Sequence, residues 1–314
     1  MSWIFSQPPL DDVALQAQAM QLLNGRPPTY LSGEELRTAT TTHGVDLATA
    51  MAWQAFRAEP TNAAFLATIA NLPVAELPAV PPGQGILIVP TMYHRERPEL
   101  GGDGTLIANI ARRLGAEVET ISVASLGGID SNAVIVARHL LASSKRRWLI
   151  SLSKGTADVK RALIQRPDLA ERIAGWISIA GMPNGTPLAG RGSGQPIPHT
   201  LLLTWLRLRG AQPGMLAEMG REHPFSRARL ELPPTLPVIN VVPMPARAHL
   251  RKPVDRSAAW LGRMGPNDGY VLLEDALVLP GMVCPLWGAD HYLRVPELAP
   301  LLYRLLRQVL SRGE

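Results

Sequence analysis

Short apolar runs alternate with longer amphipathic segments along most of the chain. Six of these runs have the length of strands and end at turn residues; they span 86–89, 117–125, 148–152, 175–180, 237–242 and 282–287. The first, Ile86 to Val89, is wholly apolar, which is typical of a strand covered on both faces. Helical patterns separate the runs, and parallel strands need such crossover connections. The pattern therefore predicts an α/β fold with a mostly parallel sheet flanked by helices.

Helices are expected where apolar residues recur at spacings of three and four. One such stripe, within 103–114, consists of Ile107, Ile110, Ala111 and Leu114. A second helix should start at Asp130 or Ser131, since either side chain can cap it; it carries Val134, Ala137, Leu140 and Leu141. Further helices are expected after residue 153 and from Pro296 to Leu310.

Residues 1–82 and 184–235 interrupt this alternation. The first region offers helical segments at 13–23, 33–37, 47–57 and 61–71 and then a Pro/Gly-rich break. Thr61 is expected to cap the last of these helices through its hydroxyl. Residues 184–235 are rich in Pro and Gly and contain one apolar helix candidate, 200–208. We therefore expect a helical N-terminal extension (1–82) and an α/β domain (83–314) into which 184–235 is inserted as a lid, hereafter the lid insertion.

Composition narrows the class of protein. The chain has 314 residues, of which 46% are hydrophobic and 18% charged, so a large core can be buried. The net charge of +5 is spread in small groups without interleaved aromatics, which argues against nucleic-acid binding. Cys284 is the single cysteine, no signal-peptide pattern opens the chain, and no apolar run reaches the roughly 18 residues of a membrane span. These features predict a cytoplasmic protein without a membrane segment and leave a homo-oligomer open.

The stretch Ser151-Leu-Ser153-Lys-Gly155 lies between an expected strand and an expected helix. A nucleophilic serine needs an exposed oxygen and nearby N–H donors for the oxyanion, and the strand–turn–helix corner G-x-S-x-G supplies both. Here a serine replaces the first glycine, and Ser151 should be small enough to fit. The alternative is an ordinary turn in which Ser153 caps the helix.

An acid and a histidine should follow such a serine in that order along the chain. His291 comes just after the run 282–287, where a loop at the carboxyl edge of the sheet would carry it. Asp268 lies 23 residues earlier in an Asn-Asp-Gly turn. Asp290 is adjacent to His291 and should point elsewhere; the other carboxylates that could be the acid are Asp255, Glu274 and Asp275.

The segments Pro266-Asn-Asp-Gly269 and Asp290-His-Tyr-Leu293 are similar to the C-terminal part of bacterial lipases, and roughly residues 84–314 resemble an α/β-hydrolase. The resemblance implies that Ser153 is the nucleophile, that His291 is the general base and then acid, and that Asp268 orients His291. It further implies an oxyanion hole made by the main-chain N–H of Lys154 and by a donor from the loop after the first strand, Met92 or Tyr93. Neither a cofactor nor a metal is expected.

For other side chains near these motifs we expect roles in the loop, in solvent contact or in substrate binding. His94 could take part in the chemistry, but a loop role is favoured. We expect the Lys154 side chain to be solvated. Within the lid insertion, Leu202, Trp205 and Leu206 are expected to bind an apolar acyl group, unless this helix only packs on the core. A deformable lining could be added by Met215, Met219 and Met244.

The sequence thus favours a serine hydrolase that cleaves a small-molecule carboxylic ester through an acyl-enzyme. Lipid ester, polyester and thioester substrates all stay open. Two alternatives stand beside it. One is an acyltransferase or thioesterase that uses the same three residues, and the other is an inactive hydrolase-fold binding protein.

Overall fold

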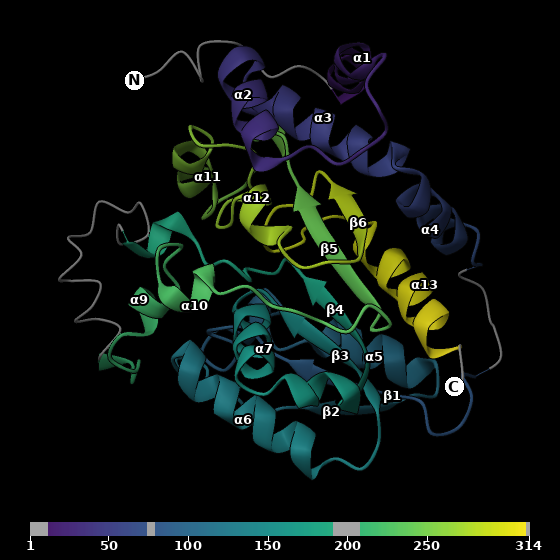
Figure 1. The fold of residues 1–314 in the computed structure, drawn as a ribbon, viewed down its shortest axis with the longest axis vertical. Helices are drawn as coiled ribbons and strands as arrows, with labels where there is room; N and C mark the ends of the chain where they lie inside the picture. The colour runs from purple at the N-terminus through teal and green to yellow at the C-terminus, as the bar shows by residue number, and fades with distance from the viewer. Residues whose placement is uncertain (1–11, 74–78, 191–207, 312–314) are drawn as a thin grey trace.

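We describe a computed structural model of the chain for residues 12–73, 79–190 and 208–311. Within these residues, six strands form one parallel sheet in the order β2-β1-β3-β4-β5-β6 (Figure 1). The strands are β1 (Gly85–Val89), β2 (Glu117–Thr120), β3 (Arg147–Leu152), β4 (Ile173–Ile179), β5 (Val238–Met244) and β6 (Met282–Trp287). Each expected strand is present, which confirms the α/β fold. β2 is shorter than expected because its partner β1 ends one residue after Ile88, the last position that pairs with it.

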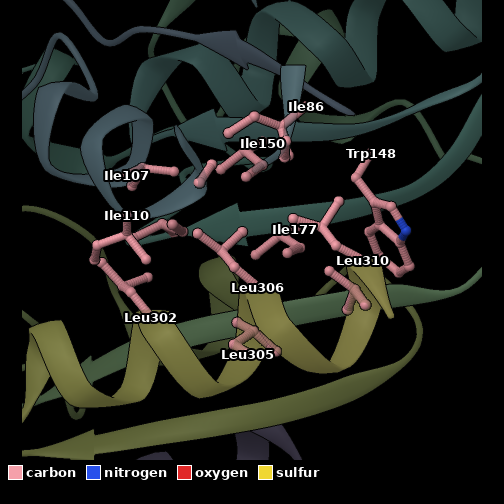
Figure 2. Close-up of a cluster of buried hydrophobic side chains, with 14 of the residues drawn as sticks. Ile86, Ile107, Ile110, Trp148, Ile150, Ile177, Leu302, Leu305, Leu306 and Leu310 are labelled. Carbon is pink, nitrogen blue, oxygen red and sulfur yellow. The ribbon is translucent and has the colours of Figure 1, made fainter. Parts of the chain in front are cut away.

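Alternate residues of each strand face opposite layers of helices. In β1, Ile86 and Ile88 join an apolar cluster with α5 (Thr105–Arg113) and α13 (Leu298–Leu310). Figure 2 shows leucines of α13 directed at Ile150 and Ile177 of the sheet. Leu87 and Val89 point the other way, into a cluster with α6 (Ile129–Ala142) and α7 (Lys154–Gln165). Burial on both faces explains why β1 is a continuous apolar run, whereas the edge strand β2 (Glu117–Thr120) is mostly exposed and polar.

Helix α6 buries only part of the stripe expected from the sequence: Leu140 is buried and Ala137 packs against the core, but Val134 and Leu141 do not. Val134 and Leu141 are 39% and 37% exposed, whereas Ala133, Val136 and Leu140 are buried. This segment carries apolar residues on two adjacent stripes, so periodicity alone does not select one. Its first residue is Ile129 and its N-cap is Gly128, so the expected caps Asp130 and Ser131 already lie inside the helix.

Residues 12–73 form four helices, α1 (Asp12–Leu23), α2 (Gly33–His43), α3 (Val45–Ala58) and α4 (Pro60–Ala70), over the β5–β6 end of the sheet (Figure 1). Ser32 and Glu35 make a capping box at the start of α2. The expectation for α4 is wrong, because its N-cap is Glu59 rather than Thr61. The Glu59 carboxylate accepts hydrogen bonds from Thr61 N (3.2 Å) and Asn62 N (2.7 Å), so the helix starts earlier, at Pro60.

Asn62 of α4 covers the free edge of β6. Its side-chain Nδ2 donates to the carbonyl of Val283 (2.9 Å), and its Oδ1 accepts from the Val283 N–H (2.8 Å). The same Nδ2 donates to the Phe56 carbonyl at 2.9 Å. The fully buried amide therefore pairs with the edge strand as a neighbouring strand would, and it blunts an edge that could otherwise recruit another chain. The boundary between extension and domain at residues 82 and 83 stays a prediction.

The segment 184–235, named the lid insertion for its expected role, lies between β4 and β5, and that role stays a prediction. Its described part contains η4 (Pro187–Gly190), α9 (Met215–Glu218) and α10 (Pro224–Arg227). The expected helix 200–208 falls, except for Leu208, outside the described residues. Between β5 and β6 lie η5 (Arg247–His249), α11 (Asp255–Leu261) and α12 (Leu273–Ala276); η2 (Pro98–Leu100) precedes α5, and η3 (Pro167–Arg172) precedes β4. None of the helices in the described ranges is both long and apolar enough to cross a bilayer.

Candidate active site

Ser153 occupies a strained corner between β3 and α7. Its backbone angles are φ 46° and ψ −114°, a region that non-glycine residues adopt only when the surroundings impose it. The next helix starts at Lys154 and passes very close to β1. A Cβ on Gly155 would lie 2.6 Å from the Val89 carbonyl oxygen and 2.8 Å from that of Pro90. Glycine at this position therefore lets the helix approach the strand, as the motif requires.

Ser151 fills the position where the motif usually has a glycine. It is fully buried, and its Oγ accepts a hydrogen bond from Trp176 Nε1 at 2.8 Å. The same oxygen lies 2.9 Å from Thr156 Oγ1, which is 3.2 Å from Ser178 Oγ. The serine thus fits, as expected, and it also ties the first turn of α7 to β3 and β4. These bonds hold the corner beneath Ser153.

The fold brings Ser153, His291 and Asp268 into one chain of hydrogen bonds. Ser153 Oγ lies 2.9 Å from His291 Nε2, and His291 Nδ1 lies 2.7 Å from Asp268 Oδ2. Ser153 follows β3, Asp268 follows β5 and α11, and His291 follows β6, so parallel strands deliver all three at their carboxyl ends. In this geometry Nδ1 carries the proton donated to Asp268, and Nε2 is free to accept one from Ser153.

Two further groups of contacts fix Asp268. Its Oδ1 accepts hydrogen bonds from the N–H groups of Tyr270 (2.9 Å) and Val271 (2.8 Å), and its carbonyl accepts from His291 N (2.8 Å). Burial lowers the pKa of His291, but the nearby charges of Asp268 and Asp290 and the hydrogen bond to Asp268 outweigh this effect. The pKa of His291 therefore lies above its ordinary value.

The loop 90–94 lies against the start of α7. The Lys154 N–H points at this loop and donates to Thr91 Oγ1 over 3.3 Å. Tyr93, held at φ 61°, donates its own N–H to the Ser125 carbonyl at 3.3 Å. The Met92 N–H has no acceptor among the described residues, so of the two residues expected to supply a second donor, Met92 is the one whose N–H is available.

The His94 side chain makes a hydrogen bond within the loop 90–94. Its Nδ1 lies 2.7 Å from the Thr91 carbonyl, and because a carbonyl can only accept, Nδ1 is the donor. Burial lowers the pKa of His94 and favours the neutral ring. These contacts agree with a loop role.

The expectation of a solvated Lys154 side chain is wrong. The residue is 1% exposed, and its Nζ pairs with Asp158 Oδ1 at 2.7 Å, one turn along α7. Asp158 Oδ2 accepts from Asn132 of α6 at 2.9 Å. Long side chains at i and i+4 share a helix face, and here that face is covered by α6. The Lys154 ammonium group is therefore paired inside the protein and is not available to a ligand.

An apolar cluster borders the three residues and includes some residues of the lid insertion. Met182, Met215 and Met219 are buried in it, and Met92, Tyr93 and Tyr270 pack at its margin. It touches the site directly, because Met182 N donates to the Ser153 carbonyl (3.3 Å) and the Tyr270 ring lies 5.1 Å from that of His291. Met244 packs instead beneath α1–α3, so its expected place here is wrong. Leu202, Trp205 and Leu206 lie outside the described residues.

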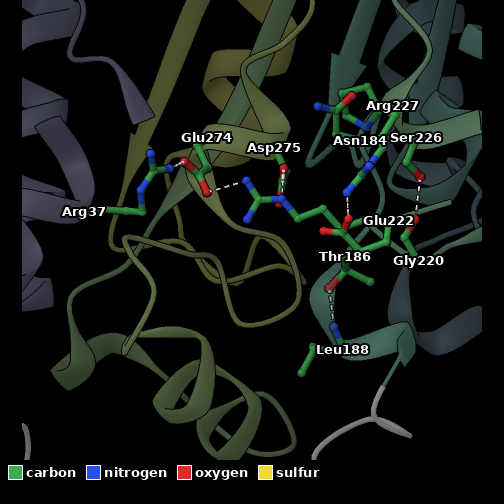
Figure 3. Close-up of polar contacts among 12 residues, drawn as sticks. Arg37, Asn184, Thr186, Leu188, Gly220, Glu222, Ser226, Arg227, Glu274 and Asp275 are labelled. Carbon is green, nitrogen blue, oxygen red and sulfur yellow. Dashed lines mark hydrogen bonds and ion pairs between the residues drawn. The ribbon is translucent and has the colours of Figure 1, made fainter. Parts of the chain in front are cut away.

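The loop that carries Asp268 is fastened from two sides. Glu274 of α12 pairs with Arg37 of α2 (Figure 3) and, at 2.6 Å, with Arg221 of the lid insertion. Arg221 also contacts Asp275 at 3.1 Å. Glu274 and Asp275, two of the alternatives to Asp268, are thus engaged with arginines away from His291. Asp255, at the start of α11, has no contact with His291 either.

Three features of the site have little signal in the sequence. They are the Thr91 hydroxyl beside Lys154 N, the Ser151–Thr156–Ser178 chain, and the ion pair between Asp290 and Arg294 next to His291. The Asp290–Arg294 spacing of four residues could have suggested a pair, had this segment been taken for a helical turn.

No protein-family profile and no curated protein matches this chain. Solved structures do share its fold. A metagenomic carboxyl esterase is 21% identical, with 76% of this chain and 79% of that one aligned and a TM-score of 0.57. A lipase from Bacillus licheniformis is 15% identical over 75% and 93%, with a TM-score of 0.50. The phospholipase PlaB from Legionella pneumophila is 12% identical over 72% and 58%, with a TM-score of 0.52.

Proposed function

We propose that this chain, which has the α/β-hydrolase fold, is a serine hydrolase that cleaves a carboxylic ester through an acyl-enzyme. One observation carries the proposal. Ser153 Oγ is 2.9 Å from His291 Nε2, and the opposite ring nitrogen is 2.7 Å from Asp268. A serine whose oxygen can lose its proton to an oriented imidazole is the activated nucleophile of acyl transfer.

In the first half of the reaction, His291 Nε2 takes the proton of Ser153 while Oγ attacks the ester carbonyl carbon. The resulting imidazolium is stabilised by Asp268, whose carboxylate is held by the N–H groups of Tyr270 and Val271. His291 then gives the proton to the leaving alcohol, and the acyl group stays on Ser153. In the second half, water loses a proton to His291 and attacks the acyl carbon. The bond between Ser153 Oγ and the acyl carbon then breaks, His291 returns the proton to Oγ, and the acid is released.

The oxyanion of each tetrahedral intermediate needs preorganised donors. The N–H groups of Lys154 and Met92 are the ones we assign to it. Lys154 N is at the amino end of α7, where the helix dipole also favours negative charge. In the structure Lys154 N donates weakly to Thr91 Oγ1 at 3.3 Å, a contact that an oxyanion can replace.

An ester with an apolar acyl group agrees best with the surroundings of Ser153. The adjacent cluster contributes methionine and tyrosine side chains, and the Lys154 charge is withdrawn into a buried pair. A site for an acidic substrate would present a cation near the serine. The carboxyl esterase, lipase and phospholipase that share the fold support an ester as the substrate class.

The test is labelling with a fluorophosphonate probe together with hydrolysis of p-nitrophenyl esters of increasing acyl length. We expect the parent protein to be labelled at Ser153 and to release nitrophenol. Ser153→Ala should abolish labelling and lower kcat by about 10³-fold or more. Ser144→Ala, at an exposed serine outside the site, is the matched control and should behave like the parent.

Two results would overturn the proposal. A folded parent protein that neither reacts with the probe nor hydrolyses any ester of the series would point to the binding-protein alternative. Undiminished labelling of Ser153→Ala would place the nucleophile elsewhere. Transfer of the acyl group to an added alcohol in preference to water would instead favour the acyltransferase alternative.

A further inference from the structure

A second carboxylate, Asp290, lies directly before His291 and is almost completely buried, with 2% exposure. Its Oδ1 accepts from Tyr292 N at 3.0 Å, and its carbonyl accepts from Leu293 N at 2.7 Å. These bonds fold the turn that presents the imidazole. The side chain does not contact the ring, yet its charge is close enough to raise the pKa of His291.

The Arg294 guanidinium contacts both oxygens of the Asp290 carboxylate, an arrangement hereafter called the Arg294 fork. Its Nε lies 3.3 Å from Asp290 Oδ1 and 3.0 Å from Oδ2, and its Nη2 contacts Oδ2 as well. The remaining donors reach the carbonyls of Lys252 (2.8 Å) and Arg251 (3.1 Å). The guanidinium is thus fixed between the His291 turn and the segment before α11, and its side chain is one-third exposed.

The groups that face the His291 ring come from three places. Asp268 and Tyr270 lie on the preceding loop, Ser153 lies at the corner of α7, and Tyr292 follows His291 in its own turn. Burial and the contact with Tyr292 raise the pKa of Tyr270, so that phenol is neutral in the working range. The charges that raise the pKa of His291 are therefore those of Asp268 and Asp290, and the cation paired with Asp290 is the Arg294 guanidinium.

We propose that Asp290 and Arg294 are positioning residues that tune His291 as a base, with the Arg294 fork opposing the charge of the buried Asp290 carboxylate. This inference rests on the proposed function. Asp268 alone supplies the charge needed to orient the ring and to stabilise the imidazolium. A second, uncompensated carboxylate would hold the imidazole protonated, and a protonated imidazole cannot accept the proton of Ser153. The Arg294 fork removes that penalty while Asp290 keeps its role in the turn.

The test is the pH profile of kcat/KM and, in parallel, of labelling by the fluorophosphonate probe. Arg294→Gln leaves Asp290 unneutralised, so the acid limb should move to higher pH by about half a unit or more. Asp290→Asn leaves Arg294 unopposed and keeps the turn's acceptor, so the limb should move to lower pH. The double variant should return close to the parent, and Arg294→Lys, which keeps the charge without the fork, should shift little.

A merely structural role would not move the acid limb of the pH profile in opposite directions in Arg294→Gln and Asp290→Asn. Loss of a structural contact would lower the rate at every pH and leave the limb in place, and that result would overturn the inference. If Arg294→Gln does not fold, Asp290→Asn still decides the matter, because it leaves no unpaired carboxylate. Failure of the parent to react with the probe would refute the proposed function instead, so the two failures are distinguishable.

Discussion

Asn62 connects the N-terminal helices to the sheet, and its replacement by leucine should be strongly destabilising. Leucine has the same branched arrangement of side-chain heavy atoms but no polar atoms. Three buried backbone groups would lose their partner: the carbonyls of Phe56 and Val283 and the N–H of Val283. The Phe56 carbonyl has no substitute within the helix, since the residue four positions later is Pro60, which has no N–H.

The size of the effect follows from these contacts. A buried backbone group left without a partner costs about 1–3 kcal/mol, so three groups cost at least about 3 kcal/mol. The added apolar surface of leucine returns about 1 kcal/mol. We expect a net loss of at least about 2 kcal/mol, which is a large part of the 5–15 kcal/mol that typically separates folded from unfolded protein.

Equilibrium unfolding in urea, followed by far-UV circular dichroism, measures the free energy of unfolding of each variant. Asn71→Leu is the matched control, because Asn71 is exposed at the end of the same helix and its side chain makes no hydrogen bond within the described residues. It should change stability by less than about 0.5 kcal/mol. A loss below about 1 kcal/mol for Asn62→Leu would refute the reasoning, since the β6 edge would then not depend on this amide.

Three other substitutions test separate parts of the structure. Gly155→Ala would place a Cβ 2.6 Å from a β1 carbonyl oxygen, so the corner that holds Ser153 should shift. We expect kcat/KM for ester hydrolysis to fall at least about tenfold. An unchanged kcat/KM would contradict the close packing. Lys154→Met leaves the buried Asp158 without its lysine partner and should lower the free energy of unfolding in urea by about 3–5 kcal/mol. Lys154→Met combined with Asp158→Leu should recover most of that free energy. Equal losses in the single and double variants would show that the ion pair itself is unimportant. Burial raises the pKa of Asp275 to about 7, so the folded state binds this proton more tightly than the unfolded state and the parent loses stability as pH rises from about 4 to about 7. Asp275→Asn removes that loss, and its stability relative to the parent should rise between pH 5 and pH 8 by about 1 kcal/mol or more; a pH-independent difference would exclude the linkage.

Local patterns were enough to predict the six strands, the longer helices and the segments that carry the candidate site. The short helices α9, α10, α11 and α12 were not expected from the sequence. The apolar runs in the interior of the sheet are strands because both of their faces are buried, as in β1. The spacing around Ser153 marks a corner because a helix must pass a strand there. The place of His291 after β6 follows the same logic, since carboxyl ends of parallel strands meet at one edge. All of these depend on residues close in sequence or on a rule that holds for every parallel sheet.

Other features depended on contacts between distant segments. Whether α6 buries Val134 or Val136, whether Lys154 reaches solvent, and which carboxylate meets His291 were decided by what packs opposite each side chain. In the sequence, Asn62 has no feature that distinguishes it from other polar helix residues. Its role appears only in the fold, where it contacts Val283 of β6, 221 positions away. A side chain's burial and hydrogen-bond partners are properties of the surface it faces, and only the folded chain brings that surface into place.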